Sequence, residues 1–439
     1  MKINENITPK HMFIAVFSCF FIAIIAWLQV KPTGNILLSN ELLELNNKYG
    51  VIDAEPLDSK EDVNLHRVRR LRASLIDTTV DKKAPEQGLI IKMKNKSEED
   101  KNDLSNVIVL KMKTNSSIDK ISTEYQKLDD VVYAEPNHRI FLTDINDETE
   151  EEESTPISII NEETLDLDKK TTVAIIDSGA DIKHKDLQGR ISKTWNTLSQ
   201  TENVDDLNGH GTHIAGILLK NSQSAQASII QFTTDGRDGT ILSLVRAIKY
   251  ATDNNSQVMN LSLGIPTYSN LMREAITYAR DKGVIIIAAT GNRSSEEILY
   301  PASWSDVISV SALNLDGEKF MFSNYGDDVE FSAIGQDVFS AAPENKYVYK
   351  SGTSQAASVV TAVTADIISL FESNSKEPPS LEKVRQLLQK ISEPISTPKM
   401  GRKISNGIDQ QDRILLLEEL NNTTVQLDQT IKEVVKLPL

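Results

Sequence analysis

Three side chains of this sequence have the types that acyl transfer requires, and they occur in the order acid, base, hydroxyl. Asp177 ends the apolar run "VAIID", His210 opens "HGTH", and Ser354 lies in "SGTSQAA". A histidine can take the proton of a serine hydroxyl, while a carboxylate holds the imidazole in the right tautomer and stabilises the imidazolium that forms. Asn292, in "ATGN", adds a side-chain amide that can donate to a developing oxyanion. The sequence therefore predicts nucleophilic catalysis at an acyl carbon.

Apolar segments that alternate with amphipathic helices must bring these residues together. Strands are expected at 171–177, 228–233, 257–263, 283–289 and 306–313, and helices at 241–254 and 270–282. Ser354 opens a segment that is apolar nearly all round, which indicates a buried central helix. Near-continuous apolar strands separated by helices are typical of an α/β fold, a parallel sheet with helices on both faces.

From about residue 171 to 365 the chain resembles the subtilisin family of serine peptidases, in which the acid, histidine and serine follow in this order. The matching segments are "VAIIDSG" (173–179), "GHGTHIAGI" (209–217), "NLSLG" (260–264), "AATGN" (288–292), "YPASW" (300–304), "FSNYG" (322–326) and "SGTSQAA" (351–357). The resemblance implies that Asp177 orients the base, His210 is the general base and Ser354 is the nucleophile. It makes Asn292 the oxyanion donor.

The same resemblance implies where a substrate binds. Ser262, Leu263 and Gly264 become the backbone edge that pairs with an extended peptide. Ala289 and Leu299 are expected beside the pocket for the residue that precedes the scissile bond. Leu299 stands where subtilisins often carry a small residue, so it is expected to narrow this pocket.

Bound metal is not expected to be part of the chemistry. After Gly216 the chain passes quickly to "SIIQFT" and omits a loop that binds calcium tightly in many subtilisins. Asp186 remains without the loop ligands, so we expect no cofactor and no high-affinity calcium site, while weak calcium binding stays open. No histidine pair outside the catalytic segment has metal-ligand spacing.

The N-terminal residues indicate that the protein is exported from the cytoplasm. Residues 12–28 carry no charge, follow two lysines, and suit either an uncleaved signal anchor or a cleaved signal peptide within 1–30. The flanking lysines favour a cytoplasmic N-terminus with the bulk outside. With 63 acidic against 47 basic side chains, the chain is a poor candidate for binding nucleic acid.

Between the apolar segment and the catalytic region, composition indicates three parts. Residues 31–87 are expected to form a polar juxtamembrane spacer, and 88–142 a small α+β module. The end of that module, "VVYAEPNHRIFL" (131–142), closely resembles the end of the ferredoxin-like inhibitory prodomain in subtilisin-like precursors; an unrelated α+β spacer is the alternative. The acidic run in 143–156 predicts a solvated linker, followed by a peptidase domain at 157–415 and a tail at 416–439.

Together these features predict a serine endopeptidase, made as a self-processed precursor that is cut between about Phe141 and Ile157. Its prodomain would be its own inhibitor, and the substrates would be exported proteins or peptides that it matures. The expected location is the extracytoplasmic face of the cell membrane, with secretion as the alternative. A catalytically inactive peptide-binding homologue and a broad-specificity secreted protease remain the competing hypotheses.

Overall fold

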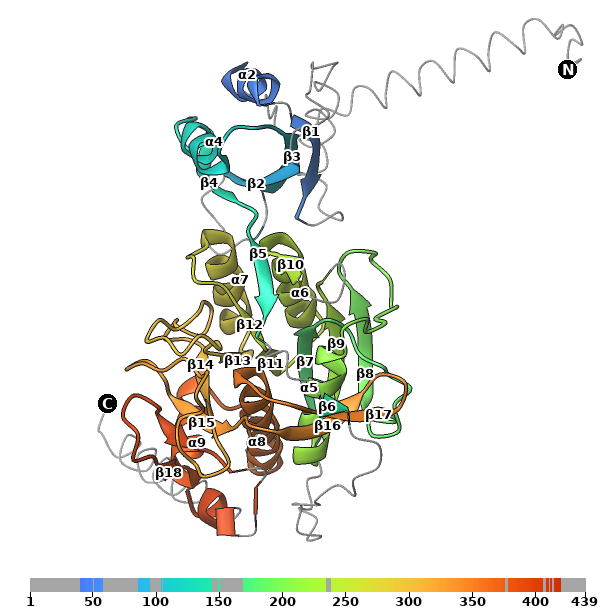
Figure 1. Ribbon diagram of the computed structural model, residues 1–439, viewed down its shortest axis with the longest axis vertical. Coiled ribbons are helices and arrows are strands. Elements are labelled where there is room, and N and C mark those ends of the chain that lie inside the picture. Colours follow the sequence, from blue (N-terminus) through green and yellow to red (C-terminus); the bar gives the residue numbers. More distant parts are fainter. Residues whose placement is uncertain are drawn as a thin grey trace, which may run out of the picture.

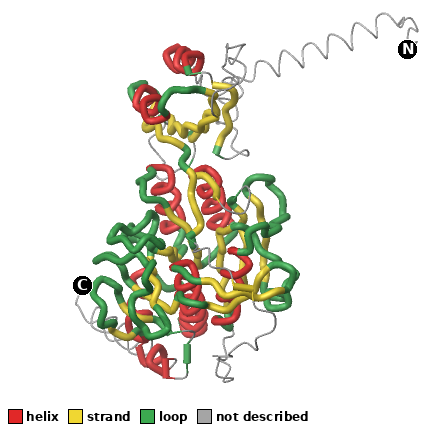
Figure 2. The backbone as a smooth tube through the Cα atoms, viewed as in Figure 1, coloured by secondary structure: helices red, strands yellow, loops and turns green. Residues whose placement is uncertain are grey.

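The computed structural model describes residues 40–49, 51–57, 86–94, 104, 106–143, 149–150, 169–233, 238–375, 378–405, 408–409, 411–412 and 414–419. Within these residues a small α+β module sits against a larger α/β domain (Figure 1). Figure 2 shows the strand that leads from the small module down into the large domain. The apolar segment 12–28, the basic stretch 66–75 and most of the C-terminal tail lie outside the described residues.

A nine-stranded sheet forms the centre of the large domain, in the order β18-β19-β15-β14-β13-β11-β7-β9-β8. All neighbours from β8 to β19 pair in parallel, and the two-residue strand β18 is antiparallel. The predicted parallel sheet is therefore confirmed. The strands are β7 (Thr171–Asp177), β8 (Ile191–Asn196), β9 (Ala225–Gln231), β11 (Val258–Leu261), β13 (Ile285–Ala289), β14 (Ile308–Leu313), β15 (Phe331–Ile334), β18 (Glu393–Pro394) and β19 (Arg402–Lys403).

Helices cover both faces of this sheet because successive strand residues point to opposite sides. On β7, Val173 and Ile175 pack with α5 (His210–Asn221), α8 (Thr353–Asn374) and α9 (Leu381–Ile391). Ala174 and Ile176 pack on the other face with α6 (Ile241–Asp253) and α7 (Asn270–Asp281). Of the helices described, only α8 is long and apolar enough to cross a membrane, and 94% of its most apolar window is buried in the domain. It is the predicted central helix.

The small module is an antiparallel sheet covered on one face by two helices. Its strands, in the order β1-β3-β2-β4, are β1 (Val51–Pro56), β2 (Glu86–Met93), β3 (Val107–Lys113) and β4 (Val131–Pro136). Residues of α2 (Asn40–Lys48) and α4 (Ile118–Tyr125) form the module's own core with Leu89 and Ile91 of β2.

This module extends further toward the N-terminus than the predicted range 88–142. α2 and β1 belong to the same sheet and core, although residues 31–87 were expected to be a spacer. A β-α-β-β-α-β module has a helix and a strand after its first strand. Here β2 pairs with the next described strand, β3, and the helix–strand unit α2–β1 precedes both in the chain. Among the described elements, the module therefore has two helices and four strands in a different chain order.

The free face of the module's sheet packs on α6 and α7. Ile90 of β2 and Val109 of β3 join the apolar cluster of those helices. Glu135 of β4 accepts hydrogen bonds from the backbone N–H groups of Asn270 (2.8 Å) and Leu271 (3.1 Å) at the start of α7, and from the Ser269 hydroxyl (2.7 Å). A carboxylate at a helix N-terminus satisfies donors that have no partner within the helix and interacts favourably with the helix dipole. This contact fixes the module relative to the large domain.

The segment 131–142 forms two strands, β4 and β5 (Arg139–Leu142), which are separated at Asn137 and His138. These two residues turn to the start of α6: the Asn137 side-chain oxygen accepts from Leu242 N (3.0 Å), and the His138 carbonyl accepts from Ile241 N (3.0 Å). The chain then enters the large domain as β5, between β10 (Asp238–Thr240) and β12 (Leu263–Gly264). A third small sheet contains β16 (Val338–Ala342), β17 (Lys346–Lys350) and β6 (Thr149–Glu150).

Candidate active site

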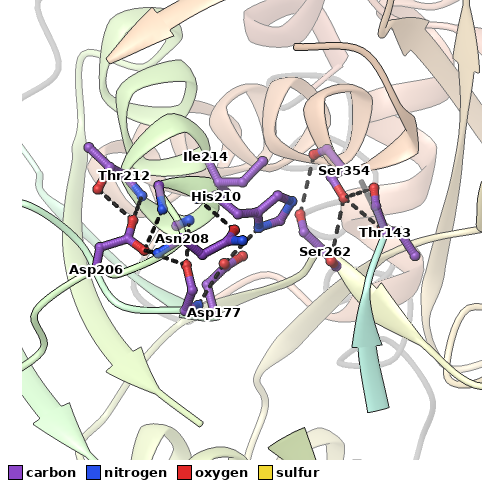
Figure 3. A network of polar contacts seen from close by, with 12 residues as sticks. Thr143, Asp177, Asp206, Asn208, His210, Thr212, Ile214, Ser262 and Ser354 are labelled. Carbon is purple, nitrogen blue, oxygen red and sulfur yellow. Dashed lines mark hydrogen bonds and ion pairs between the residues drawn. The ribbon is translucent and has the colours of Figure 1, made fainter. Parts of the chain in front are cut away.

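The four residues predicted to do chemistry lie at the ends of elements that meet at one edge of the large sheet. Asp177 is the last residue of β7, and His210 is the first residue of α5. Ser354 is the second residue of α8, and Asn292 follows β13. In the view of Figure 3 the imidazole of His210 lies between Asp177 on one side and Ser354 on the other.

The acid and the base form a buried hydrogen-bonded pair. His210 Nδ1 lies 2.7 Å from Asp177 Oδ1, and both side chains are 0% exposed. Ser178 N donates to the same carboxylate oxygen at 2.7 Å. Burial raises the pKa of the Asp177 carboxyl, and the charge and hydrogen bond of His210 oppose this rise. With the carboxylate accepting from Nδ1–H, Nε2 is the ring nitrogen that can take a proton from a hydroxyl.

A second carboxylate, Asp206, holds the start of α5, and the sequence analysis missed it. Its Oδ2 accepts from Thr212 N (2.8 Å) and from the Thr212 hydroxyl (2.6 Å). Its Oδ1 accepts from Gly209 N (2.8 Å) and from the Ser178 hydroxyl (2.8 Å), and that hydroxyl oxygen accepts from Gly211 N (2.9 Å). Figure 3 shows this network beside the His210 ring. Asp206 thus ties the turn after β7 to the helix that carries the base; its position shortly before "GHGTH" was the available signal.

Ser354 and Asn292, predicted as the nucleophile and the oxyanion donor, both contact one carbonyl group of the chain itself. The Thr143 carbonyl oxygen accepts from Ser354 Oγ (2.7 Å) and from Asn292 Nδ2 (2.8 Å). The amide oxygen of Asn292 accepts from Thr353 N (2.9 Å), so the NH₂ group of Asn292 faces Thr143. Thr143 Oγ1 also lies 2.6 Å from Ser354 Oγ. Thr143 was expected at the start of the linker 143–156, but in the structure its carbonyl contacts Ser354 and Asn292.

Strand β5 presents this carbonyl as an extended peptide substrate would. Leu142 and Phe141 pair antiparallel with Leu263 and Gly264, and Thr143 N donates to Ser262 O at 3.2 Å. Ser262, Leu263 and Gly264, which were predicted as the substrate edge, thus pair with the chain's own segment 141–143. On the other side β5 pairs with β10, a strand that the sequence analysis did not identify. The side chain of Ile140 is buried, whereas Phe141 is 51% exposed.

Leu299, which was predicted to narrow the pocket for the residue before the scissile bond, packs against the backbone at Gly264 and Gly291. A Cβ atom placed on Gly264 would lie 2.8 Å from Leu299 Cβ, and one placed on Gly291 would lie 2.7 Å from Leu299 Cδ1. Leu299 is therefore in contact with the backbone on both sides of the pocket and is only 7% exposed. Ala289, also predicted to contribute, is buried at the end of β13.

The surroundings of Asp186 do not fit a tightly held metal ion. Asp186 Oδ2 accepts a hydrogen bond from the Tyr347 hydroxyl at 2.8 Å, and Lys185 Nζ lies 5.0 Å from the centre of the Tyr347 ring. Across the described ranges no group of three or more His, Cys, Asp or Glu side chains could hold a metal ion. Calcium binding needs six to eight oxygen ligands. We therefore derive no chemical step through a metal.

Known proteins match most of the large domain in sequence. The model of the subtilase family matches residues 168–408. Over 234 residues the chain is 33% identical to the thermophilic serine proteinase of Bacillus sp. (strain AK1). This match covers 51% of this chain and 57% of that protein. It is 32% identical over 237 residues to the thermostable alkaline protease of Halalkalibacterium halodurans, covering 52% of this chain and 63% of the relative. It is 32% identical over 234 residues to thermitase of Thermoactinomyces vulgaris, and the match covers 51% of this chain and 81% of thermitase. The chain thus spans less than two thirds of the length of the first two relatives.

Replacing Asn292 by Leu tests the oxyanion donor. The change removes the donor to the Thr143 carbonyl and leaves Asp177, His210 and Ser354 in place. We expect the turnover number for a peptide to fall by about 100- to 1,000-fold with little change in KM, because this donor acts mainly on charge that develops in the transition state. Steady-state kinetics of the matured variant measure both constants. A variant within threefold of the parent would remove Asn292 from this role.

Proposed function

This chain belongs to the subtilase family, and from that premise we propose that it is a serine endopeptidase whose precursor cuts its own chain after Thr143. In this mechanism His210 takes the proton of Ser354, and the serine oxygen attacks the Thr143 carbonyl carbon. Asn292 donates to the oxyanion that forms. Protonated His210 then gives its proton to the leaving amine, and water hydrolyses the acyl-enzyme with His210 again as the base.

The observation that carries this proposal is the position of the Thr143 carbonyl. One carbonyl oxygen accepts from both Ser354 Oγ and Asn292 Nδ2, at 2.7 and 2.8 Å. Its strand is held on both sides by backbone pairing, in the geometry that peptide-binding clefts use for β-augmentation. The next bond, Thr143–Asp144, lies within the range 141–157 expected from the sequence. The acidic residues that follow carry too little apolar area to hold the new N-terminus by burial.

The same contacts support the module 40–142 as an inhibitor of its own enzyme. β5 occupies the strand edge that a substrate needs, and the module's sheet buries apolar residues against α6 and α7. The carboxylate of Glu135 at the start of α7 adds charge-assisted hydrogen bonds to this interface. Inhibition would persist after the cut, because these contacts do not depend on the peptide bond after Thr143.

We place the enzyme outside the cytoplasm, tethered by residues 12–28, with maturation of exported proteins or peptides as its role. The support for this location is the uncharged run 12–28 and the lysines before it. A cleaved signal peptide and a secreted enzyme of broad specificity form the alternative. Extraction of membranes with alkaline carbonate separates the two: a tethered precursor stays with the lipid, and its release into the soluble fraction would contradict the anchor.

Self-processing predicts the N-terminus of the mature enzyme. In a purified preparation the parent protein should yield a mature chain that begins at Asp144, whereas Ser354→Ala should remain uncut because it lacks the nucleophile. N-terminal sequencing and intact mass of both proteins measure this. Cutting of both at the same bond would mean that another peptidase does the work. A parent chain that is cut elsewhere would show that Thr143 is not at the scissile bond.

Leu299 predicts the preference for the residue before the scissile bond. Since Leu299 contacts both backbone walls of the pocket, the parent should favour small or medium residues such as Thr and Ala over Phe. Leu299→Gly should raise the ratio of kcat/KM for Phe over Thr by at least about tenfold, because pocket volume typically discriminates by 10- to 200-fold. Peptides that differ only at this position give the ratio.

Ile298→Ala is the matched control for Leu299→Gly. Ile298 is about equally buried on the same loop, but its side chain approaches Gly326 rather than Gly264 and Gly291. It should leave the preference unchanged. Efficient cleavage after Phe by the parent, or an equal shift in the two variants, would show that Leu299 does not set the preference.

A further inference from the structure

The segment "FSNYG" (322–326) contains a buried asparagine that the catalytic scheme above does not use. Asn324 is 0% exposed and lies in the loop that follows β14. Its own backbone is anchored to the sheet, because its carbonyl oxygen accepts from the hydroxyl of Ser311 in β14 at 2.8 Å. The Ser323 hydroxyl donates to the same oxygen at 3.0 Å.

Asn324 contacts the residues on either side of the oxyanion donor Asn292. Its backbone N–H donates to Gly291 O at 2.8 Å, and its side-chain oxygen accepts from Arg293 N at 2.8 Å. The same oxygen accepts from Ser295 N at 3.3 Å. The peptide groups before and after Asn292 are thus tied to one residue.

The side-chain NH₂ group of Asn324 holds the two ends of the same loop. It donates to Thr290 O and to Glu297 O, both at 3.0 Å. Thr290 O also accepts from the backbone N–H of Leu299 at 3.1 Å, so the residue that fills the substrate pocket belongs to this arrangement. An Asn side chain supplies two N–H donors and an oxygen with two lone pairs, and this loop uses both donors and both lone pairs.

The packing around Asn324 leaves the loop little room to move. A Cβ atom on Gly291 would lie 2.6 Å from Asn324 Nδ2, and Gly291 has a φ of +107°, which other residues rarely adopt. Glycine therefore lets the amide lie directly against the backbone that precedes Asn292.

We propose that Asn324 is a positioning residue that sets the place of the Asn292 amide in the oxyanion site; this inference rests on the proposed function. Asn292 Nδ2 must lie about 3 Å from the oxyanion, and a misplacement of about 1 Å can lower the rate by about 100-fold. Asn324 connects the donor loop to β14 through hydrogen bonds on both sides of Asn292. The oxyanion donor is thereby tied to the central sheet.

Asn324→Asp is the informative substitution. It keeps the size of the side chain and the acceptor for Arg293 N and Ser295 N, and it replaces the two donations to Thr290 O and Glu297 O by repulsion between oxygens. The loop should shift at both ends while the residues of the triad keep their contacts. Asn324→Ser, which is shorter and neutral, serves if the Asp variant does not fold.

The test is a double-mutant cycle of the full-length chain with Asn292→Leu. All variants are matured with a trace of tagged parent enzyme, which is then removed, and Ser354→Ala processed in the same way measures any remaining parent activity. The substrate is a peptide with the sequence of residues 138–149. We expect Asn324→Asp to lower kcat by about 10- to 100-fold with KM within threefold of the parent, and to lower kcat by less than threefold when Asn292 is already Leu.

Ser369→Ala is the matched control, since it removes a buried hydrogen bond (Ser369 Oγ to Lys169 O, 2.6 Å) fifteen residues after Ser354 on α8, about 22 Å along the helix axis. This control substitution should change kcat by the same factor in the parent and in the Asn292→Leu variant. The proposal is overturned if Asn324→Asp lowers kcat by the same factor in the parent and in the Asn292→Leu variant, or if it leaves the kcat of the parent unchanged. Failure of the proposed function looks different: the parent does not hydrolyse the peptide, and Asn292→Leu changes nothing.

Discussion

The structure depends on the place of one carbonyl group, that of Thr143. Its oxygen must reach both the hydroxyl at the start of α8 and the amide of Asn292, which lie 62 positions apart in the sequence. It must do so while Thr143 N bonds to Ser262 O on the neighbouring edge. Hydrogen bonds to developing charge are effective only when the donors are in place beforehand. The rest of the fold keeps the Thr143 carbonyl, the Ser354 hydroxyl and the Asn292 amide in fixed positions.

The large sheet holds the groups of the enzyme, and the small module holds the carbonyl. Parallel strands place Asp177 and the Asn292 loop at the same edge, and the buried α8 brings Ser354 there. Asp206 adds rigidity at the start of α5 through hydrogen bonds with Gly209 and Thr212. On the module's side, apolar contacts with α6 and α7 and the contact of Glu135 with α7 aim β5 along the substrate edge.

The large domain could be predicted because its signals are local. Strands such as 171–177 and 283–289 are apolar throughout, and β7 and β13 were found within two residues of these ranges. The triad could be predicted because residue types and their chain order reflect the chemistry directly. The position of Leu299 beside the substrate edge followed from the resemblance, and the structure adds its contacts with Gly264 and Gly291.

Other features depend on contacts between distant parts of the chain. β1 is a short strand, and its partner β3 lies some fifty residues further on, so nothing local joined α2 and β1 to the module. The break between β4 and β5 arises because Asn137 binds the start of α6. Asp206 and Asn324 are polar loop residues whose side chains bond mostly to backbone groups, and backbone groups leave no pattern in side-chain types.

The central claim is that Ser354 is a competent nucleophile whose site the chain itself fills until the module 40–142 has been cut off and has left the mature enzyme. Labelling by a fluorophosphonate, which reacts only with an activated and accessible serine, tests both parts at once. The comparison is between the mature enzyme and a precursor kept uncut by Asp144→Pro, in which Ser354 is unchanged. The account predicts rapid labelling of the mature enzyme at Ser354 and little labelling of the precursor. No labelling of the mature enzyme, or equal rates in the two proteins, would contradict it.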